Sequence, residues 1–154
     1  FLNFSRVARV TAAFGDLRTR GDLAGAVARF ADDAVFEGWG LCAANPCVGK
    51  AAIEAETGRE VRDHLRGTFV PGTNRVSGDI QTVRSEVRSD SIRAAGIERV
   101  LISVTAEVRG ERITRLRYEL DLSDAQTARF LAAQTPARLP ATGNGGLADE
   151  GGGP

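Results

Sequence analysis

Few side chains in this sequence combine the type and the spacing that acid–base chemistry requires. Asp32 and Asp33 are adjacent carboxylates, which could serve as a general acid and a general base. Such a pair more often ends a helix and solvates the turn that follows, and we favour this interpretation. His64 is the only histidine, and no partner for it is visible in the sequence. We therefore expect it on the buried face of a helix as a structural residue.

Two cysteines, Cys42 and Cys47, share one loop around Pro46. A disulfide is possible at this spacing. The first residues are too few and too polar for the core of a signal peptide, so we expect a cytoplasmic protein whose free thiols act as small hydrophobic groups. With His64 they make too few ligands for a zinc site, and we expect neither a metal nor an organic cofactor.

Length and charge limit the function classes. The 154 residues suit one domain, and 20 basic and 20 acidic residues give a net charge of zero. This balance argues against nucleic acid or an anionic membrane as a partner, and no apolar run approaches the roughly 20 residues that span a bilayer. The absence of Met indicates a processed chain or a fragment of a longer protein.

Helical periodicity dominates the first half of the chain. Apolar residues recur at helical spacing over 6–20, 22–30 and 50–66, with Gly21 and Gly67 as stops and Asp22 as a cap. A short strand over 34–37 and a loop over 38–48 separate the last two helices. The expected buried stripe of the third helix is Ile53, Thr57, Val61, His64 and Leu65.

The second half has the two-residue period of strands. Strands are predicted near 69–70 and over 80–89, 98–109 and 112–122, followed by a short helix over 123–134. The Gly- and Pro-rich tail, 136–154, is expected to be disordered. This order predicts one α+β domain over 5–135: a strongly bent antiparallel sheet forms a cone-shaped half-barrel around three N-terminal helices, with a pocket at its open end.

The two long strands can be paired residue by residue. Gly110 and Glu111 suit a two-residue turn, which pairs Arg109 with Arg112. Continued without a break, this register places Ser103 opposite Tyr118, with Leu116 and Leu120 on the same face. That face mixes apolar groups, a tyrosine and hydroxyls, as a ligand pocket does.

The opposite face of the same hairpin carries an apolar strip. Val100, Ile102 and Val104 would lie on it beside charged residues of the last strand. A monomer would leave this strip in water, so the pattern predicts a homodimer through it. The alternative is that helices or the tail cover the strip. The arginines at the hairpin end alternate with glutamates, which is typical of a solvated mosaic of charges.

Several motifs together resemble a known superfamily. They are Gly21-Asp22-Leu23, Phe30-Ala31-Asp32-Asp33-Ala34, Gly49-Lys50-Ala51-Ala52-Ile53, and the run from Arg112-Ile113 to Tyr118-Glu119-Leu120-Asp121-Leu122. Over about 5–134 the chain resembles the nuclear-transport-factor-2-like (NTF2-like) superfamily, with its cystatin-like fold. This superfamily includes ketosteroid isomerases, limonene epoxide hydrolases and SnoaL-like polyketide cyclases. These motifs mark the fold and do not choose among its activities.

The resemblance places the isomerase's functional groups on residues that cannot replace them. Its base falls on Gly38, its first-helix tyrosine on Phe14, and its third donor near Ser103 or Val104. We therefore expect no ketosteroid isomerase activity, because the base and the oxyanion donors of that enzyme are missing.

The resemblance to limonene epoxide hydrolases preserves one element. Arg88-Ser89-Asp90 matches their Arg-x-Asp pair, whereas their last-strand carboxylate falls on Tyr118. The Arg88 guanidinium would lower the pKa of Asp90 and weaken it as a base, and Tyr118 could donate a hydrogen bond to a ligand oxygen. In the alternative interpretation Arg88 and Asp90 belong to an alternating charged set that faces solvent.

Two function hypotheses follow. The first is a cofactor-independent enzyme, of epoxide-hydrolase or cyclase type, that acts on a small apolar molecule carrying an oxygen. Arg88, Asp90 and Tyr118 would be catalytic, and the pocket would comprise Phe14, Phe36, Trp39, Ser103, Leu116 and Leu120. The second is a non-catalytic module of the same fold that binds a ligand or dimerises.

Overall fold

The computed structural model describes residues 2–134. The predicted tail, 136–154, lies outside these residues. Three N-terminal helices are present as expected, and two more follow: α1 (Leu2–Thr19), α2 (Leu23–Val27), α3 (Lys50–Arg62), α4 (Asp90–Ala94) and α5 (Ala125–Gln134). Asp22 caps α2 by accepting a hydrogen bond from the Gly25 amide. Within residues 2–134 no helix has the length and apolar character needed to cross a membrane.

Seven strands form one mixed sheet. They are β1 (Phe30–Glu37), β2 (Cys47–Val48), β3 (Arg66–Phe69), β4 (Arg75–Ser77), β5 (Ile80–Arg88), β6 (Val100–Arg109) and β7 (Arg112–Leu120). The order is β2-β1-β7-β6-β5-β3, with β4 beside β5, and a short 3-10 helix, η1 (Gly40–Cys42), precedes β2. The prediction of an antiparallel sheet was wrong in one respect, because β1 pairs with β7 in parallel. Nor is the sheet strongly curled, as a cone would require.

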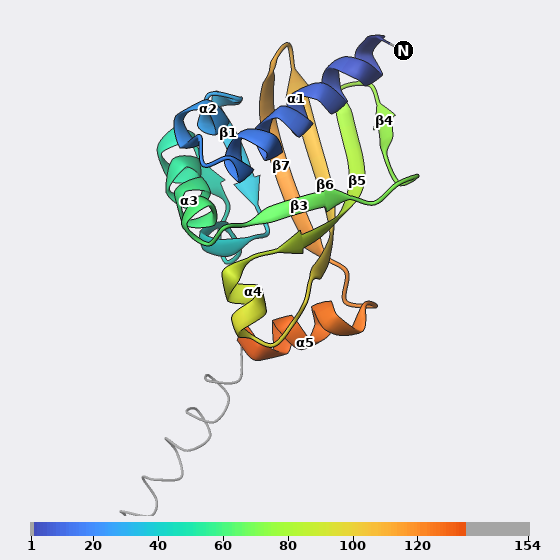
Figure 1. Cartoon of the computed structure of the whole chain (residues 1–154). Coiled ribbons are helices and arrows are strands. Elements are labelled where there is room, and N and C mark those ends of the chain that lie inside the picture. The colour runs from blue at the N-terminus through green and yellow to red at the C-terminus, as the bar shows by residue number, and fades with distance from the viewer. Residues whose placement is uncertain (1, 135–154) are drawn as a thin grey trace, which may run out of the picture.

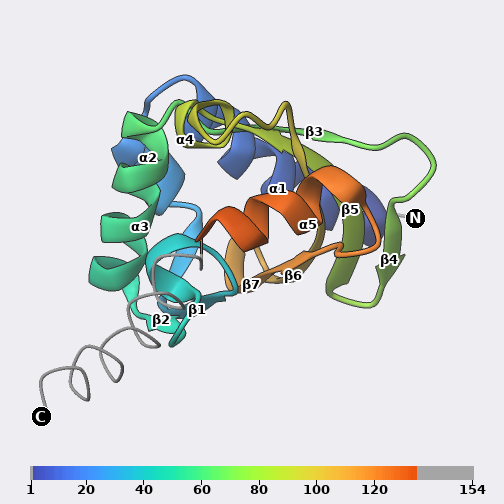
Figure 2. The ribbon, with the colours of Figure 1, turned by 90° about the horizontal axis from the view of Figure 1, so that it is seen from below.

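The helices cover one face of this sheet. Figure 1 shows α1 lying across the sheet, with α2 and α3 beside it near β1. Helix α1 contacts β3 to β7, and α3 contacts β1 and β2. Seen from below in Figure 2, α5 lies near the end of β6, which it contacts. Apolar residues between α1 and the sheet, such as Val10, Phe14 and Leu116, form the core.

A β-bulge changes the register of the β6–β7 hairpin. Val108 pairs with Ile113 as expected, but Glu107 pairs with Arg115, so Thr114 is an extra residue. Every later pair is displaced by one position, and Tyr118 lies opposite Val104. The predicted pairing of Tyr118 with Ser103 was therefore wrong, because one extra residue exchanges the faces of a strand.

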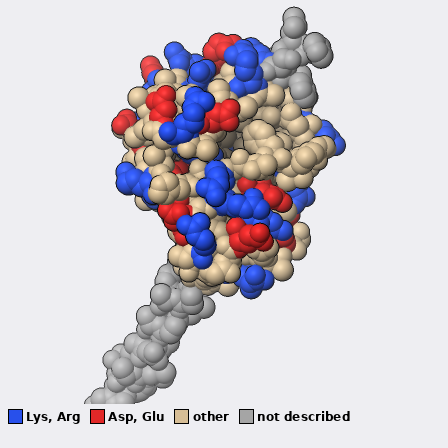
Figure 3. All heavy atoms as spheres, viewed as in Figure 1, with Lys and Arg blue, Asp and Glu red and all other residues tan. Residues whose placement is uncertain are grey.

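The bulge also removes the predicted dimer surface. Val100, Ile102 and Val104 are at most 5% exposed and lie in the core beneath the helices. They form no wet apolar strip, so the interface predicted there was wrong. The alternative, in which helices cover these residues, is correct. On the face seen in Figure 3, basic and acidic side chains are interspersed.

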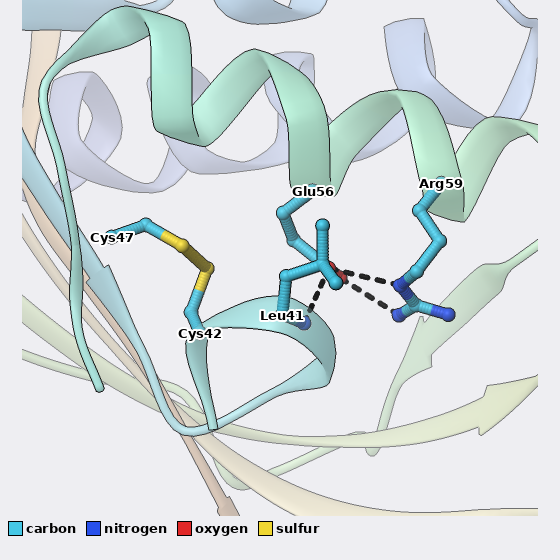
Figure 4. Close-up of a disulfide and its surroundings, with 5 residues drawn as sticks. All are labelled: Leu41, Cys42, Cys47, Glu56 and Arg59. Carbon is cyan, nitrogen blue, oxygen red and sulfur yellow. Dashed lines mark hydrogen bonds and ion pairs between the residues drawn. A yellow bond between two sulfur atoms is a disulfide. The ribbon is translucent and has the colours of Figure 1, made fainter. Parts of the chain in front are cut away.

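Two further expectations were wrong between η1 and α3. Cys42 and Cys47 are not free thiols: they form a disulfide, with a Cα–Cα distance of 5.1 Å, that joins η1 to β2 (Figure 4). Helix α3 buries Glu56 and Glu60, whereas His64 lies beyond its end and its side chain is 71% exposed. The buried face of α3 is therefore rotated from the predicted stripe towards two carboxylates.

Candidate functional site

A cavity of about 160 Å³ lies between α1 and the inner face of the sheet. Its polar groups include Arg18, on the last turn of α1, and Tyr118, on β7. Its walls are mainly apolar and include Phe14, Leu65, Val87, Ile102, Val104 and Leu116. Enclosure by apolar walls with a few convergent polar groups is typical of a small-molecule site.

Arg18 is the central polar group of this site. It is 6% exposed, and its guanidinium carbon lies 5.0 Å from the centroid of the Phe14 ring. Its Nη1 donates to Oε1 of Glu60 at 2.9 Å and to the hydroxyl of Tyr118 at 3.0 Å. Its buried Nε has no hydrogen-bond partner among residues 2–134. The cavity is thus bordered by a charged donor group that keeps an unused N–H.

The surroundings keep Arg18 charged and Tyr118 neutral. Burial lowers the pKa of Arg18, but the neighbouring oxygens of Tyr118 and Glu60 raise it more, so the net shift is upward. Burial raises the pKa of Tyr118 above its ordinary value. Because the Tyr118 hydroxyl accepts a hydrogen bond from Arg18, its own proton remains available for a second acceptor.

Behind Arg18, helix α3 buries two carboxyl groups one helical turn apart. Glu56 and Glu60 are four residues apart and fully buried. Burial, together with Glu56, raises the pKa of Glu60 to about 8 despite the opposing effect of Arg18. Burial also tends to raise the pKa of Glu56, but hydrogen bonds from the Arg59 side chain and the Leu41 amide contribute to lowering it overall. Figure 4 shows both groups meeting the Glu56 carboxylate beside the disulfide.

The structure does not bring the Arg88 and Asp90 side chains to Tyr118. Arg88 ends β5 and lies 3.5 Å from Glu86, and neither Arg88 nor Asp90 lines the cavity. Asp90 begins α4, where its carboxylate contacts Nδ1 of His64 at 2.5 Å and the Arg93 guanidinium at 2.9 Å. The hydrogen bond with His64 is the main cause of a lowered pKa of Asp90.

The residues predicted to line the pocket separate into groups. Phe14, Leu116 and Tyr118 line the cavity. Phe36 packs against Tyr118, with ring centroids 5.1 Å apart. Trp39 and Leu120 instead line a second hollow, where the Trp39 ring stacks on that of Phe130 at 6.1 Å. Ser103 lies on the opposite face of β6, which follows from the shifted register.

Gly38 explains why the isomerase's carboxylate position carries no side chain here. Its φ is +94°, and a Cβ atom at this position would lie 2.0 Å from the carbonyl oxygen of Tyr118. Only glycine tolerates both conditions, so the close approach of the chain to β7 excludes an aspartate.

Sequence reasoning missed Arg18, Glu56 and Glu60. A signal for Arg18 was present, because it follows the core residue Phe14 by four and therefore shares its helical face. The two glutamates are likewise four apart, but the apolar stripe assigned to their helix placed them outside the core. Among residues 2–134, no group of three or more His, Cys, Asp or Glu residues could hold a metal ion.

Comparisons with known proteins bear on the fold. No family model matches the sequence, and neither does any curated protein. Among solved structures, an LEH-like epoxide hydrolase of M. tuberculosis has a TM-score of 0.61 and 17% identity, covering 88% of this chain and 97% of its own. A computationally designed 17-OHP binder has a TM-score of 0.64 and 21% identity, with coverages of 77% and 92%.

A third neighbour carries the name of the fold. It is an NTF2-like protein of Cytophaga hutchinsonii, with a TM-score of 0.60 and 10% identity, covering 76% of this chain and 91% of its own. Identities this low show the fold alone. The sequence motifs, the topology and the structural neighbours agree that this chain has the NTF2-like fold.

Proposed function

We propose that this protein binds a small, mainly apolar molecule that carries one oxygen group, in the cavity beneath α1. The observation that carries the proposal is the buried Nε of Arg18, which has no partner among the described residues while Arg18 borders the cavity. A ligand oxygen there would accept from this N–H and from the Tyr118 hydroxyl. It would satisfy a buried donor whose isolation otherwise costs about 1–3 kcal/mol.

The cavity volume sets the size of the ligand. An engineered protein cavity of about 150 Å³ holds one benzene molecule. The 160 Å³ found here therefore suits a single ring or a compact terpenoid fragment. Each Å² of apolar ligand surface removed from water would contribute about 25 cal/mol to binding.

The structural neighbours support binding more than any one reaction. A designed 17-OHP binder shows that this fold can enclose a small molecule, and an epoxide hydrolase shows that it can support catalysis. Catalysis through Arg88 and Asp90 is not favoured in this chain, because neither side chain lines the cavity. We therefore place the protein with the ligand binders of this fold.

Two broader predictions remain. A homodimer stays a prediction, but without the surface that the sequence suggested. A cytoplasmic location also stays a prediction, and the Cys42–Cys47 disulfide argues against it, because such bonds persist in oxidising compartments.

Gly15 offers a direct test of the binding site. It borders the cavity within α1, and a Cβ atom added there meets nothing within 4 Å. Gly15→Leu should fill the cavity while improving helix propensity by about 1 kcal/mol. Calorimetric titration with phenol or cyclohexanone should show binding to the wild type and loss of binding in Gly15→Leu.

The control for this test is Ala55→Leu, which adds a leucine to an exposed helical position on α3 and should bind like the wild type. The proposal would be overturned by equal affinity in Gly15→Leu, or by a wild type that binds neither these neutral probes nor the related anion benzoate.

A further inference from the structure

The buried groups next to the cavity do not balance in charge. Arg18 and Arg59 both carry a positive charge at any physiological pH. Glu56 and Glu60 are both fully buried, and Oε2 of Glu60 has no hydrogen-bond partner among the described residues. A buried carboxyl group with an unpartnered oxygen favours its neutral form, and burial together with Glu56 raises the pKa of Glu60 to about 8. The pair therefore holds one negative charge, which leaves one positive charge in the cluster uncompensated.

The contacts identify which charge lacks a partner. Arg59 donates two hydrogen bonds to Glu56, at 2.9 and 2.8 Å, so these two charges neutralise each other. Arg18 donates to Glu60, whose raised pKa keeps it protonated at pH 7, and to the neutral Tyr118 hydroxyl. An almost fully buried cation without a counter-ion is costly, and its free Nε belongs to a residue that borders the cavity.

An adjoining hollow adds positive charge on the outer side of Arg18. This hollow, of about 280 Å³, shares Arg18, Thr19 and Leu65 with the cavity. It is also lined by the exposed residues Arg20 and Arg66. The opposing charges nearby are Asp16, exposed at the rim of the cavity, and Asp90, which is engaged with His64 and Arg93. Basic groups around an entrance raise the local concentration of anions.

We infer that the oxygen group of the ligand is a carboxylate, carried on an apolar body of about one ring and paired with the guanidinium of Arg18. This inference rests on the function proposed above and names the ligand class of that same site. The carboxylate would accept from Nε of Arg18 and from the Tyr118 hydroxyl. It would supply the negative charge that the Glu56–Glu60 pair lacks.

A matched pair of probes tests the charge. Benzoate and benzamide have the same ring and nearly the same shape, but only benzoate is an anion at pH 7. Calorimetric titration of the full chain should give benzoate an affinity at least about tenfold higher than that of benzamide. The preference should shrink as salt screens the basic entrance.

Variants tie this preference to Arg18. Arg18→Met should abolish the preference for benzoate over benzamide. The double variant Arg18→Met/Glu60→Gln should also abolish this preference, without leaving the carboxyl group of Glu60 unpaired in the core. The matched control is Arg115→Met, because Arg115 is an exposed residue of β7 paired with Glu37 outside the cavity. This control should keep the full preference for benzoate.

The possible outcomes separate the two proposals. Equal binding of benzoate and benzamide would overturn the carboxylate inference and leave the binding function standing. A preference for benzoate that survives in both Arg18 variants would also overturn it. A wild type that binds none of the four probes, benzoate, benzamide, phenol and cyclohexanone, would overturn both proposals.

Discussion

Arg18 and Glu60 form a buried pair in which Nη1 of the arginine donates to Oε1 of the glutamate at 2.9 Å. Their side chains are 6% and 0% exposed, and they join the last turn of α1 to the last turn of α3. The pair holds the guanidinium against Tyr118 at the cavity wall. Removing either partner would leave the other buried without its contact, so packing of the two helices and the chemistry of the cavity depend on the same groups.

The raised pKa of Glu60 makes stability fall as the pH rises. In the folded chain Glu60 keeps its proton up to about pH 8, whereas the unfolded chain loses it near 4.5. Between these values the folded state binds more protons, so the free energy of unfolding should decrease with pH by up to about 1.4 kcal/mol per unit. Glu60→Gln mimics the protonated acid, and denaturant titrations across pH 5–8 should show this decrease removed.

The matched control is Glu54→Gln, which changes an exposed carboxylate on the same helix. It should retain the wild-type dependence on pH. The lowered pKa of Glu56 affects stability below its ordinary value and so outside this window. Parallel curves for the wild type and Glu60→Gln would show that Glu60 is ionised in the folded protein.

The Tyr118 hydroxyl should contribute to both stability and binding. Tyr118→Phe removes the acceptor of an Arg18 hydrogen bond inside the core, which should cost about 1–2 kcal/mol of unfolding free energy. It should also weaken binding of benzoate about tenfold, since one donor to the ligand is lost. Denaturant unfolding and calorimetry measure the two effects.

Ser103→Ala serves as the comparison, because it deletes a hydroxyl from the opposite face of β6. It should change neither stability nor affinity appreciably. Equal affinities of wild type and Tyr118→Phe would exclude the hydroxyl from ligand contact.

Gly38 should not tolerate any side chain. Gly38→Ala combines a positive φ with a Cβ placed 2.0 Å from the Tyr118 carbonyl oxygen, and we expect a loss of about 2–4 kcal/mol in unfolding free energy. Gly72→Ala shares the positive φ but meets nothing within 4 Å, so it should lose only about 1 kcal/mol. Denaturant unfolding measures both losses of unfolding free energy. Similar losses in the two variants would show that the backbone of β7 can move away from the added Cβ atom.

The disulfide should stabilise the loop that carries Trp39 and Leu41. Cys42 and Cys47 are five residues apart, and closing so short a loop in the unfolded chain is worth about 2 kcal/mol. The free energies of unfolding measured with and without reductant should differ by this amount. The Cys42→Ser/Cys47→Ser variant should have the unfolding free energy of the reduced wild type, and reductant should not change it. A wild type that is insensitive to reductant, or that contains two titratable thiols, would contradict the disulfide.

The architecture was largely predictable because its signals are local. Apolar residues at helical spacing and Gly21 gave the first two helices, and alternation gave the long strands, to within a few residues. The parallel pairing of β1 with β7 was not predictable in this way, because it joins residues at least 80 positions apart and leaves no local signal.

The candidate site was harder to predict because single residues decide its geometry. The extra residue Thr114 lies in an ordinary strand pattern, yet it moves Tyr118 from the face of Ser103 to that of Val104. Likewise, residues of the types of Arg18 and Glu60 are rarely buried, and the contact that brings these two together lies between two helices, where the sequence leaves no local signal.

Ligand contact with Arg18 can be observed directly at its Nε–H group. Its resonance in ¹H–¹⁵N spectra of the full chain is assigned by its absence from Arg18→Met. Addition of benzoate should shift this resonance downfield in the wild type, as expected for a new hydrogen bond to a carboxylate. Gly15→Leu, with its cavity filled, should show no shift. Binding of benzoate that leaves the Arg18 Nε–H resonance unchanged would show that the carboxylate does not contact Arg18.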